Sequence, residues 1–405
     1  MKTNIPLAGW TQALTRSALQ DMLVASTQPG LISFALGLPA AELFPTGDFA
    51  SAVARVLATD PRALQYGPPL RHLKSQIVGL MALRGVSCRE EQVFLTTGAQ
   101  QGLNLLVRLL LEPRGAVLLE ERSYTGFQQV LQPYQPQTIR VSTDLDDGMD
   151  VAAVEQALSR GPRPALLYAV TDGHNPLGVS MSLDNRERLA ALAGRHGLPV
   201  IEDDPYGFLC YEPAPPPPLR AFEERWVFYV GTFSKILAPA VRTGWVVVPE
   251  ELVPLLANVK EASDIDMAPL SQRAVSSYLE TGALPAHLTA LRDEYRRRRD
   301  AMLNALGRHF PDEARWRKPT SGLFIWVEVP DGVDLSRLWR EAIEVARVAF
   351  IPGQAFDVVG GQSSGNGLRL NFSNSTPAQI EEGIASLGRM LKRHLSSVSA
   401  LPTRA

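Results

Sequence analysis

The sequence has few of the residues that build covalent cross-links or metal sites. Among 405 residues there are two cysteines, Cys88 and Cys210, and they form no CxxC pair. The six histidines are scattered, without the spacing of a metal-binding motif. We therefore expect no metal site, and a reduced, cytoplasmic protein whose thiols are incidental.

Long apolar runs and an excess of one charge are also missing. No stretch approaches the length of a membrane span, and the first residues lack the continuous apolar core of a signal peptide. The formal net charge is -2 and the isoelectric point about 6.3, which indicates no polyanionic partner. The arginine run at 296–299 lies between acidic residues within a helical period, so we interpret it as a solvated helix face. We expect binding neither to membranes nor to nucleic acid.

Short apolar runs alternate with helical patterns in the middle of the chain. Strands are predicted at 92–95, 116–119, 137–141, 165–170, 199–202, 227–230 and 244–248. Helices are predicted at 99–111, 126–131, 151–158 and 182–196. This alternation predicts parallel strands covered by helices, which is an α/β fold.

The flanking regions follow other patterns. Residues 1–30 have the spacing of an amphipathic arm, helices are predicted at 47–59 and 73–84, and 249–310 is helical. Strands at 323–327, 349–351 and 368–372, with helices at 335–346 and 378–395, indicate a smaller α+β unit. We expect an arm with part of the small domain in 1–45, a large domain in 46–300 and a C-terminal small domain in 301–405.

A lysine lies within the most informative stretch, residues 230–245. Apolar runs precede and follow it, and Thr232, Ser234, Lys235 and Arg242 lie between them. Lysine is otherwise scarce, occurring at positions 2, 74, 260, 318 and 392. A partly desolvated amine has a lowered pKa, which suits Schiff-base chemistry. This stretch alone leaves open a surface lysine beside a turn.

Three polar motifs follow the carboxyl ends of predicted strands, where ligands bind in an open α/β sheet. In the first, Gly98 turns the chain into a helix whose first N–H groups favour a phosphate; a plain helix start is the alternative. In the second, acidic residues 202–204 close an apolar strand and are costly unless paired. A carboxylate there can hold a protonated ring nitrogen, and Tyr206 can reach a phenolic oxygen. Helix capping by Asp204 explains only one of the three acids.

The third motif, 171–178, contains an Asn175-Pro176 turn. The Asn175 amide can donate to a ring oxygen, or it forms only an Asx-turn. We interpret His174 as a loop histidine. Within a further apolar strand, Arg369 must be paired, and its planar fork matches a carboxylate; an intramolecular salt bridge is the alternative.

The order and spacing of these motifs resemble the fold-type-I, pyridoxal-phosphate-dependent aminotransferases of class I and II. The branch is that of the kynurenine/α-aminoadipate and MocR-like aminotransferases, and the resemblance covers residue 33 to the C-terminal helix. Its most specific pieces are Ser234-Lys235 with Pro239 and Arg242, Asp203-Asp204-Pro205-Tyr206, and Asn175-Pro176-Leu177-Gly178. It implies a large domain with a mainly parallel seven-stranded sheet, a smaller α+β domain, bound pyridoxal phosphate and a homodimer with shared active sites.

The resemblance also implies a role for each matching residue. Lys235 would form a Schiff base with the cofactor and shuttle a proton, Asp203 would pair with the pyridinium nitrogen, and Arg369 would bind the substrate α-carboxylate. Asn175 and Tyr206 would hydrogen-bond the ring oxygen, and Tyr124 would stack on the ring. The phosphate would be held by Gly98, Ala99, Gln100, Thr232, Ser234 and Arg242, while Tyr66 would reach the phosphate in the partner subunit.

The implied reaction is amino-group transfer between an α-amino acid and a 2-oxo acid with ping-pong kinetics. Three departures from the family pattern bear on the substrate. Leu36-Gly37 replaces two adjacent glycines and should crowd the pocket mouth. Gln20 stands where an arginine often meets an acidic side chain, which favours an apolar or aromatic amino acid. The loop after Tyr66 is shorter than usual.

Two other functions remain open on the same scaffold. One is a different carbanion enzyme, such as a lyase, a decarboxylase or a cyclising enzyme of specialised metabolism. The same residues serve amino-group transfer and these other reactions. The other is a regulatory module as in MocR-type transcription factors, which the short, non-basic segment 1–30 disfavours.

Overall fold

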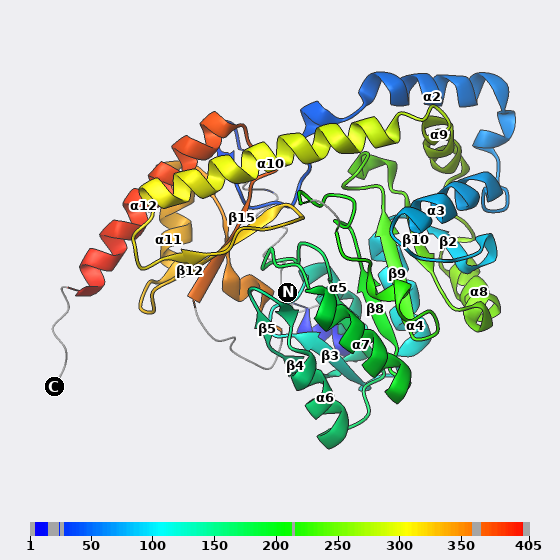
Figure 1. Ribbon diagram of the computed structural model, residues 1–405, viewed down its shortest axis with the longest axis horizontal. Helices are drawn as coiled ribbons and strands as arrows, with labels where there is room; N and C mark the ends of the chain where they lie inside the picture. The colour runs from blue at the N-terminus through cyan, green and yellow to red at the C-terminus, as the bar shows by residue number, and fades with distance from the viewer. Residues whose placement is uncertain (1–4, 15–23, 25–27, 213–214, 359–365, 400–405) are drawn as a thin grey trace.

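The fold is known from a computed structural model that describes residues 5–14, 24, 28–212, 215–358 and 366–399. Its centre is a seven-stranded sheet with the order β2-β10-β9-β8-β7-β3-β4 (Figure 1). Strand β10 is antiparallel to both of its neighbours, and the remaining pairs are parallel. The strands are β2 (Val93–Thr96), β3 (Ala116–Glu120), β4 (Gln137–Val141), β7 (Leu166–Ala169), β8 (Val200–Asp203), β9 (Val227–Thr232) and β10 (Gly244–Val247). The predicted α/β fold with a mainly parallel seven-stranded sheet is confirmed.

Helices cover both faces of this sheet. One face packs against α4 (Ala99–Leu110), α5 (Thr125–Leu131) and α8 (Val253–Asp264). The other packs against α6 (Val151–Arg160), α7 (Leu183–His196) and α3 (Arg71–Leu83). Because side chains alternate along a strand, Phe228 and Val230 face α4 whereas Val227 and Tyr229 face the opposite side. The same alternation places neighbouring side chains at the ends of the strands on opposite faces of the sheet.

A smaller α+β unit lies beside the large one, as predicted. Its antiparallel sheet has the order β11-β12-β15-β14, with β11 (Arg315–Trp316), β12 (Phe324–Val329), β14 (Ile351–Pro352) and β15 (Asn366–Asn371). The helices α11 (Leu335–Glu341) and α12 (Pro377–Ser399) belong to this unit. The long helix α10 (Leu284–His309) packs along α12 and spans both units (Figure 1). The exact limits of the domains stay a prediction.

Short elements complete the chain. Strand β1 (Ile32–Ser33) pairs in parallel with β13 (Val348–Ala349), so the segment after the arm joins the small unit. Helices α2 (Thr46–Thr59) and α9 (Pro269–Leu279) pack on each other, and β5 (Thr143–Asp144) pairs with β6 (Gly148–Met149). Of the predicted arm, a short 3₁₀ helix at Gly9–Ala13 is seen, whereas Gln20 lies outside the described residues. None of the helices seen is long and apolar enough to cross a membrane.

Two elements differ from the sequence prediction. The predicted strand 349–351 is two strands, because the buried Phe350 separates β13 from β14 and each pairs with a different neighbour. The predicted helix 335–346 is α-helical only to Glu341 and continues as a π-helical turn, Ala342–Ala346.

The interpretation of arginines 296–299 as a solvated helix face is wrong for half of the run. Arg298 and Arg299 are only 3% and 1% exposed, because their side chains lie on the face of α10 that packs against the rest of the protein. Arg298 pairs with Glu42 and Glu294, each at 2.6 Å. Arg299 pairs with Glu212 at 3.2 Å. These arginines link parts of the fold.

Candidate functional site

A cavity of about 290 Å³ lies at the carboxyl edge of the parallel strands. Segments that follow β7, β8 and β9, the start of α4 and strand β15 of the small unit form its wall. The structure brings most of the predicted site residues together there: Leu36, Gly37, Ala99, Gln100, Tyr124, Asn175, Asp203, Tyr206, Thr232, Ser234, Lys235, Arg242 and Arg369.

Lys235 lies just after β9 and points into the cavity. Its Nζ donates a hydrogen bond to the carbonyl oxygen of Gly37 at 2.8 Å. Burial, together with the nearby cations Arg369 and Arg242, lowers the pKa of the Lys235 amine to about 8. Lys235 is therefore no ordinary surface lysine, since about a tenth of its amine is neutral at pH 7.

Asp203 ends β8, and its side chain lies on the α4 face of the sheet. Its Oδ2 accepts a hydrogen bond from the Tyr168 hydroxyl at 2.7 Å. Its Oδ1 is buried and has no donor among the residues that the structure describes. Burial raises the pKa of Asp203 to about 7, although the Tyr168 hydroxyl opposes this rise. A buried carboxylate oxygen without a donor is costly, so this atom suits a cationic N–H group in the cavity.

Arg369 on β15 brings a buried positive charge to the opposite wall. Its Nη1 donates to the side-chain oxygen of Asn175 at 2.6 Å, and its Nη2 donates to the carbonyl oxygen of Ala35. Its Nε is buried and has no acceptor within the described part of the chain. The guanidinium carbon lies 4.2 Å and 4.7 Å from the ring centres of Phe324 and Phe356.

The charge of Arg369 is available to a ligand. Burial lowers the pKa of Arg369 to about 10, so the group stays charged at neutral pH. Among the described residues no carboxylate forms an ion pair with Arg369, which removes the alternative of an intramolecular salt bridge. Because Asn175 uses its side-chain oxygen on Arg369, its NH₂ group remains to donate elsewhere.

The opposite end of the cavity is built to hold an anion. Gly98 has φ +77° and starts α4, and a Cβ there would lie 2.3 Å from the Arg242 guanidinium. Arg242 donates to the Thr97 carbonyl at 3.1 Å and to Ser234 Oγ at 3.4 Å. Thr232 Oγ1 is 2.9 Å from Ser234 Oγ. A helix N-terminus, two hydroxyls and an arginine thus converge on one point.

Two tyrosines line the cavity between these ends. The ring of Tyr124 lies over Gly126, where an added Cβ would be 2.4 Å from the ring. Burial raises the pKa of Tyr124 to about 12. Tyr206 is buried edge-on against Phe324, with the ring centres 6.0 Å apart, and burial raises the pKa of its hydroxyl. Both hydroxyls therefore stay protonated at neutral pH and can donate.

Three predicted residues are placed differently from the rest. Gly98 does not line the cavity but sets the start of α4. Tyr66 is 84% exposed and lies outside the cavity of its own chain, so its proposed contact with a partner subunit stays a prediction. Gln20 lies outside the described residues.

Sequence reasoning missed several side chains of the cavity wall, of which Tyr168 and Phe324 contact predicted site residues. Tyr168 holds Asp203 while its ring stacks on Phe127 at 3.8 Å; a tyrosine in an otherwise apolar strand could have drawn attention to it. Phe324 packs under Arg369 and against Gly37, where a Cβ would lie 2.7 Å from its ring. As one apolar residue of an apolar strand, Phe324 carries no signal in the sequence.

Comparison with known proteins identifies the family. Residues 40–387 match aminotransferase class I and II. The chain belongs to this family. It is 37% identical over 401 residues to the 2-aminoadipate transaminase of Thermus thermophilus, covering 96% of this chain and 97% of the relative. It is 33% identical over 388 residues to aromatic-amino-acid aminotransferase 1 of Thermococcus litoralis, covering 94% and 92%. The kynurenine aminotransferase of Pyrococcus horikoshii superimposes with a TM-score of 0.89, at 34% identity over 96% and 97% of the two chains.

The aminotransferase is thus an enzyme that uses pyridoxal phosphate, as the sequence motifs predict. The site fits this cofactor at three points. The partnerless Oδ1 of Asp203 suits a protonated ring nitrogen, and the anion cradle at α4 suits a phosphate. The Lys235 side chain lines the same cavity. The described ranges contain no group of three or more histidine, cysteine, aspartate or glutamate side chains that could hold a metal ion.

Proposed function

We propose that this aminotransferase moves the amino group of an apolar or aromatic α-amino acid to a 2-oxo acid by a ping-pong mechanism. The observation that carries the proposal is the joint placement of Lys235, Asp203 and Arg369 around one cavity. Lys235 supplies a partly neutral amine, Asp203 an unpaired buried carboxylate oxygen and Arg369 a cation that no carboxylate neutralises.

The chain's own residues hold the cofactor. When bound, pyridoxal phosphate supplies an aldehyde that reacts with amines and a protonated ring that accepts the electrons of a broken Cα–H bond. Asp203 keeps the ring nitrogen protonated, and Asn175 with Tyr206 donates to the ring oxygen. The start of α4, Thr232, Ser234 and Arg242 would hold the phosphate, and Tyr124 would supply an aromatic surface for the cofactor.

Lys235 and Arg369 act on the substrate. Arg369 binds the α-carboxylate with the donors that the protein leaves unused, which turns the Cα–H bond toward Lys235. With cofactor and amino acid bound, the neutral amine of Lys235 would remove the Cα proton. In the second half of the cycle it delivers a proton to the corresponding carbon of the 2-oxo acid. A base with a pKa near 8 suits this exchange at neutral pH.

The cavity wall supports an apolar or aromatic side chain. Among the described residues that line it, the cations are Lys235, Arg242 and Arg369, and each already has a role. No further lining cation remains for an acidic side chain within that part of the chain. Leu36, Leu38 and Phe324 instead offer apolar surface.

The proposal includes a homodimer with shared sites. Leu64 and Tyr66, which are two positions apart, are 75% and 84% exposed, so two large side chains on this segment are left uncovered. Analytical ultracentrifugation measures the mass of the protein in solution and so tests whether it is a dimer. Mixing Lys235→Ala with Tyr66→Ala subunits tests the sharing, because a mixed dimer regains one complete site only if Tyr66 serves its partner. Mixtures as inactive as the separate variants would contradict the shared site.

A screen of amino donors tests the function directly. The holoenzyme is mixed with single amino acids, and the loss of the cofactor's visible absorption is followed together with the released 2-oxo acid. We expect conversion with aromatic and branched donors at the highest kcat/KM, slower conversion with glutamate, and parallel lines in two-substrate kinetics. Failure to release a 2-oxo acid from any donor, or release of CO₂ or an elimination product instead, would identify a different carbanion enzyme.

A further inference from the structure

A group of buried charges lies behind the active site, on the face of the sheet opposite the cavity. It consists of Arg84, Asp172, Arg186 and Asp204, which we call the rear charge network. Their exposed fractions are 6%, 1%, 0% and 2%. None of them lines the cavity, so the reaction described above makes no use of them.

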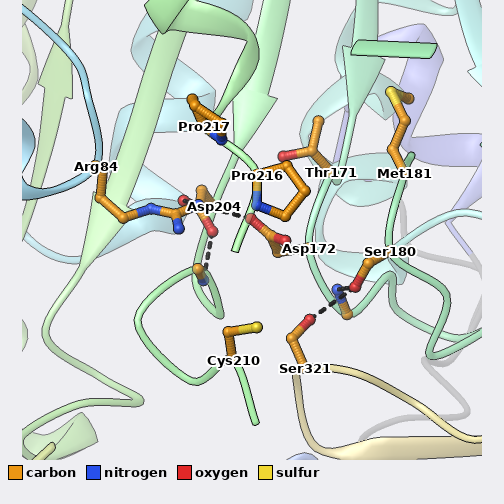
Figure 2. A network of polar contacts seen from close by, with 12 residues as sticks. Arg84, Thr171, Asp172, Ser180, Met181, Asp204, Cys210, Pro216, Pro217 and Ser321 are labelled. Carbon is orange, nitrogen blue, oxygen red and sulfur yellow. Dashed lines mark hydrogen bonds and ion pairs between the residues drawn. The ribbon is translucent and has the colours of Figure 1, made fainter. Parts of the chain in front are cut away.

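Arg84 is the residue that joins the two carboxylates of this network. Its Nη2 lies 2.7 Å from Asp172 Oδ2 and 3.4 Å from Asp204 Oδ2. Figure 2 shows Arg84 reaching these two carboxylates from the end of α3. Asp172 is held further by Arg186, with Nη2 to Oδ1 at 2.8 Å.

Asp204 accepts two more hydrogen bonds, from Tyr229 and Gly207. Its Oδ2 accepts from the Tyr229 hydroxyl at 2.8 Å, and its Oδ1 accepts from the backbone N–H of Gly207 at 2.6 Å. The second bond closes the turn that contains Tyr206. Every carboxylate oxygen of Asp172 and Asp204 therefore has a donor, and Arg84 is the donor that they share.

The two carboxylates belong to the two loops that carry the cofactor-binding groups. Asp172 stands three residues before Asn175 in the loop after β7. Asp204 follows Asp203 directly at the end of β8. Because successive side chains point to opposite faces, Asp203 faces the cavity while Asp204 faces Arg84.

Loss of the Arg84 charge would leave Asp172 and Asp204 without the cation that they share. Burial raises the pKa of Asp204, and Arg84 is the main charge that opposes this rise, while Asp172 adds to it. Without Arg84, two buried carboxylates would approach one site with no cation between them, which is costly. The repulsion would be relieved if the loops moved apart or if one carboxylate took up a proton. Either change would alter the loops that carry Asn175 and Asp203.

We propose that Arg84 is a positioning residue for the aminotransferase reaction, which fixes the loops after β7 and β8 relative to each other so that Asn175 and Asp203 meet the cofactor together. The inference rests on the roles proposed above for Asn175 and Asp203. Arg84 itself touches neither cofactor nor substrate.

The test compares Arg84→Met with Arg299→Met in the holoenzyme. Arg299 is an equally buried arginine whose partners, Glu212, Asp300 and Pro319, lie outside the cavity wall. Turnover is measured per cofactor-loaded site, well below the melting temperature of each variant. We expect kcat to fall about 100-fold in Arg84→Met, since a small misplacement of reacting groups costs this much. Arg299→Met should melt earlier but keep the wild-type kcat.

Three further variants, Arg84→Lys, Arg84→Gln and Asp172→Asn, keep the test decisive if Arg84→Met does not fold. Arg84→Lys retains a single positive charge and should recover most of the lost turnover, whereas Asp172→Asn should lower kcat less than Arg84→Met would. Wild-type kcat per loaded site in Arg84→Met, or in both Arg84→Gln and Asp172→Asn, would overturn the inference. Asp203→Asn separates the two proposals. Wild-type activity in Asp203→Asn would refute the proposed role of Asp203 itself, on which the role of Arg84 rests.

Discussion

The hydrogen bond from Tyr168 to Asp203 offers a sharp test of how the site holds the cofactor's ring nitrogen. Tyr168→Phe removes one hydroxyl and leaves the ring, which stacks on Phe127 with an interplanar angle of 7°. The packing of the strand is therefore kept, and the change acts on the Asp203 carboxylate alone.

The size of the effect follows from the contact. The O–O distance is 2.7 Å and both groups are buried, and hydrogen bonds to charged groups contribute about 1.5–3 kcal/mol. This corresponds to a loss of about 10- to 100-fold in cofactor affinity and turnover. The sign of the pH effect is also fixed. The hydroxyl holds down the pKa of Asp203, which burial raises to about 7, so its loss raises that pKa further. Less Asp203 is ionised at pH 7, and the defect should shrink as the pH rises.

The assay titrates cofactor into cofactor-free protein and measures kcat per loaded site between pH 6.5 and 9. Tyr278→Phe is the matched control, because Tyr278 is fully buried and its hydroxyl has no hydrogen-bond partner in the described ranges. We expect the control to behave like the wild type. Unchanged affinity and turnover in Tyr168→Phe, or a defect that grows with pH, would refute the reasoning.

Three other predictions concern the same cavity. The rate at which cofactor-free protein takes up pyridoxal phosphate should rise with pH to a plateau with a midpoint near 8, because only the neutral amine of Lys235 attacks an aldehyde; stopped-flow absorbance that still rises steeply at pH 10 would contradict this. Gly126→Ala should weaken cofactor binding about tenfold, since its Cβ would lie 2.4 Å from the Tyr124 ring; an unchanged Kd from titration would show that the ring adapts freely. Leu36→Gly should widen the cavity and shift the ratio of kcat/KM about tenfold toward the bulkiest aromatic donors; an unchanged donor ranking would place specificity elsewhere.

Much of the site could be predicted because polar residues interrupt a very apolar pattern. Asn175, Asp203 and Thr232 each end or follow a buried strand, and parallel strands bring such ends to one edge. Arg369 stands alone in an apolar strand, and burial there makes an unpaired cation meaningful. The alternation of short strands and helices likewise predicted the mainly parallel sheet.

The rest depends on contacts between distant segments, which a single sequence does not contain. Arg84 ends a helix and is indistinguishable there from an exposed arginine, yet it reaches Asp172 and Asp204 far along the chain. The same limit applies to Arg298 and Arg299, because helical periodicity cannot tell which face a second domain covers. Phe324 is defined as part of the site only by its position under Arg369.

The central claim is that Lys235 carries the cofactor and moves the substrate proton. The most direct measurement is the visible absorption and half-reaction of Lys235→Ala, compared with Lys318→Ala, in which a half-exposed surface lysine is removed. The account predicts that Lys235→Ala loses both the absorption of the lysine-bound cofactor and the release of 2-oxo acid, while its circular dichroism stays that of the wild type. Wild-type turnover in Lys235→Ala would contradict it.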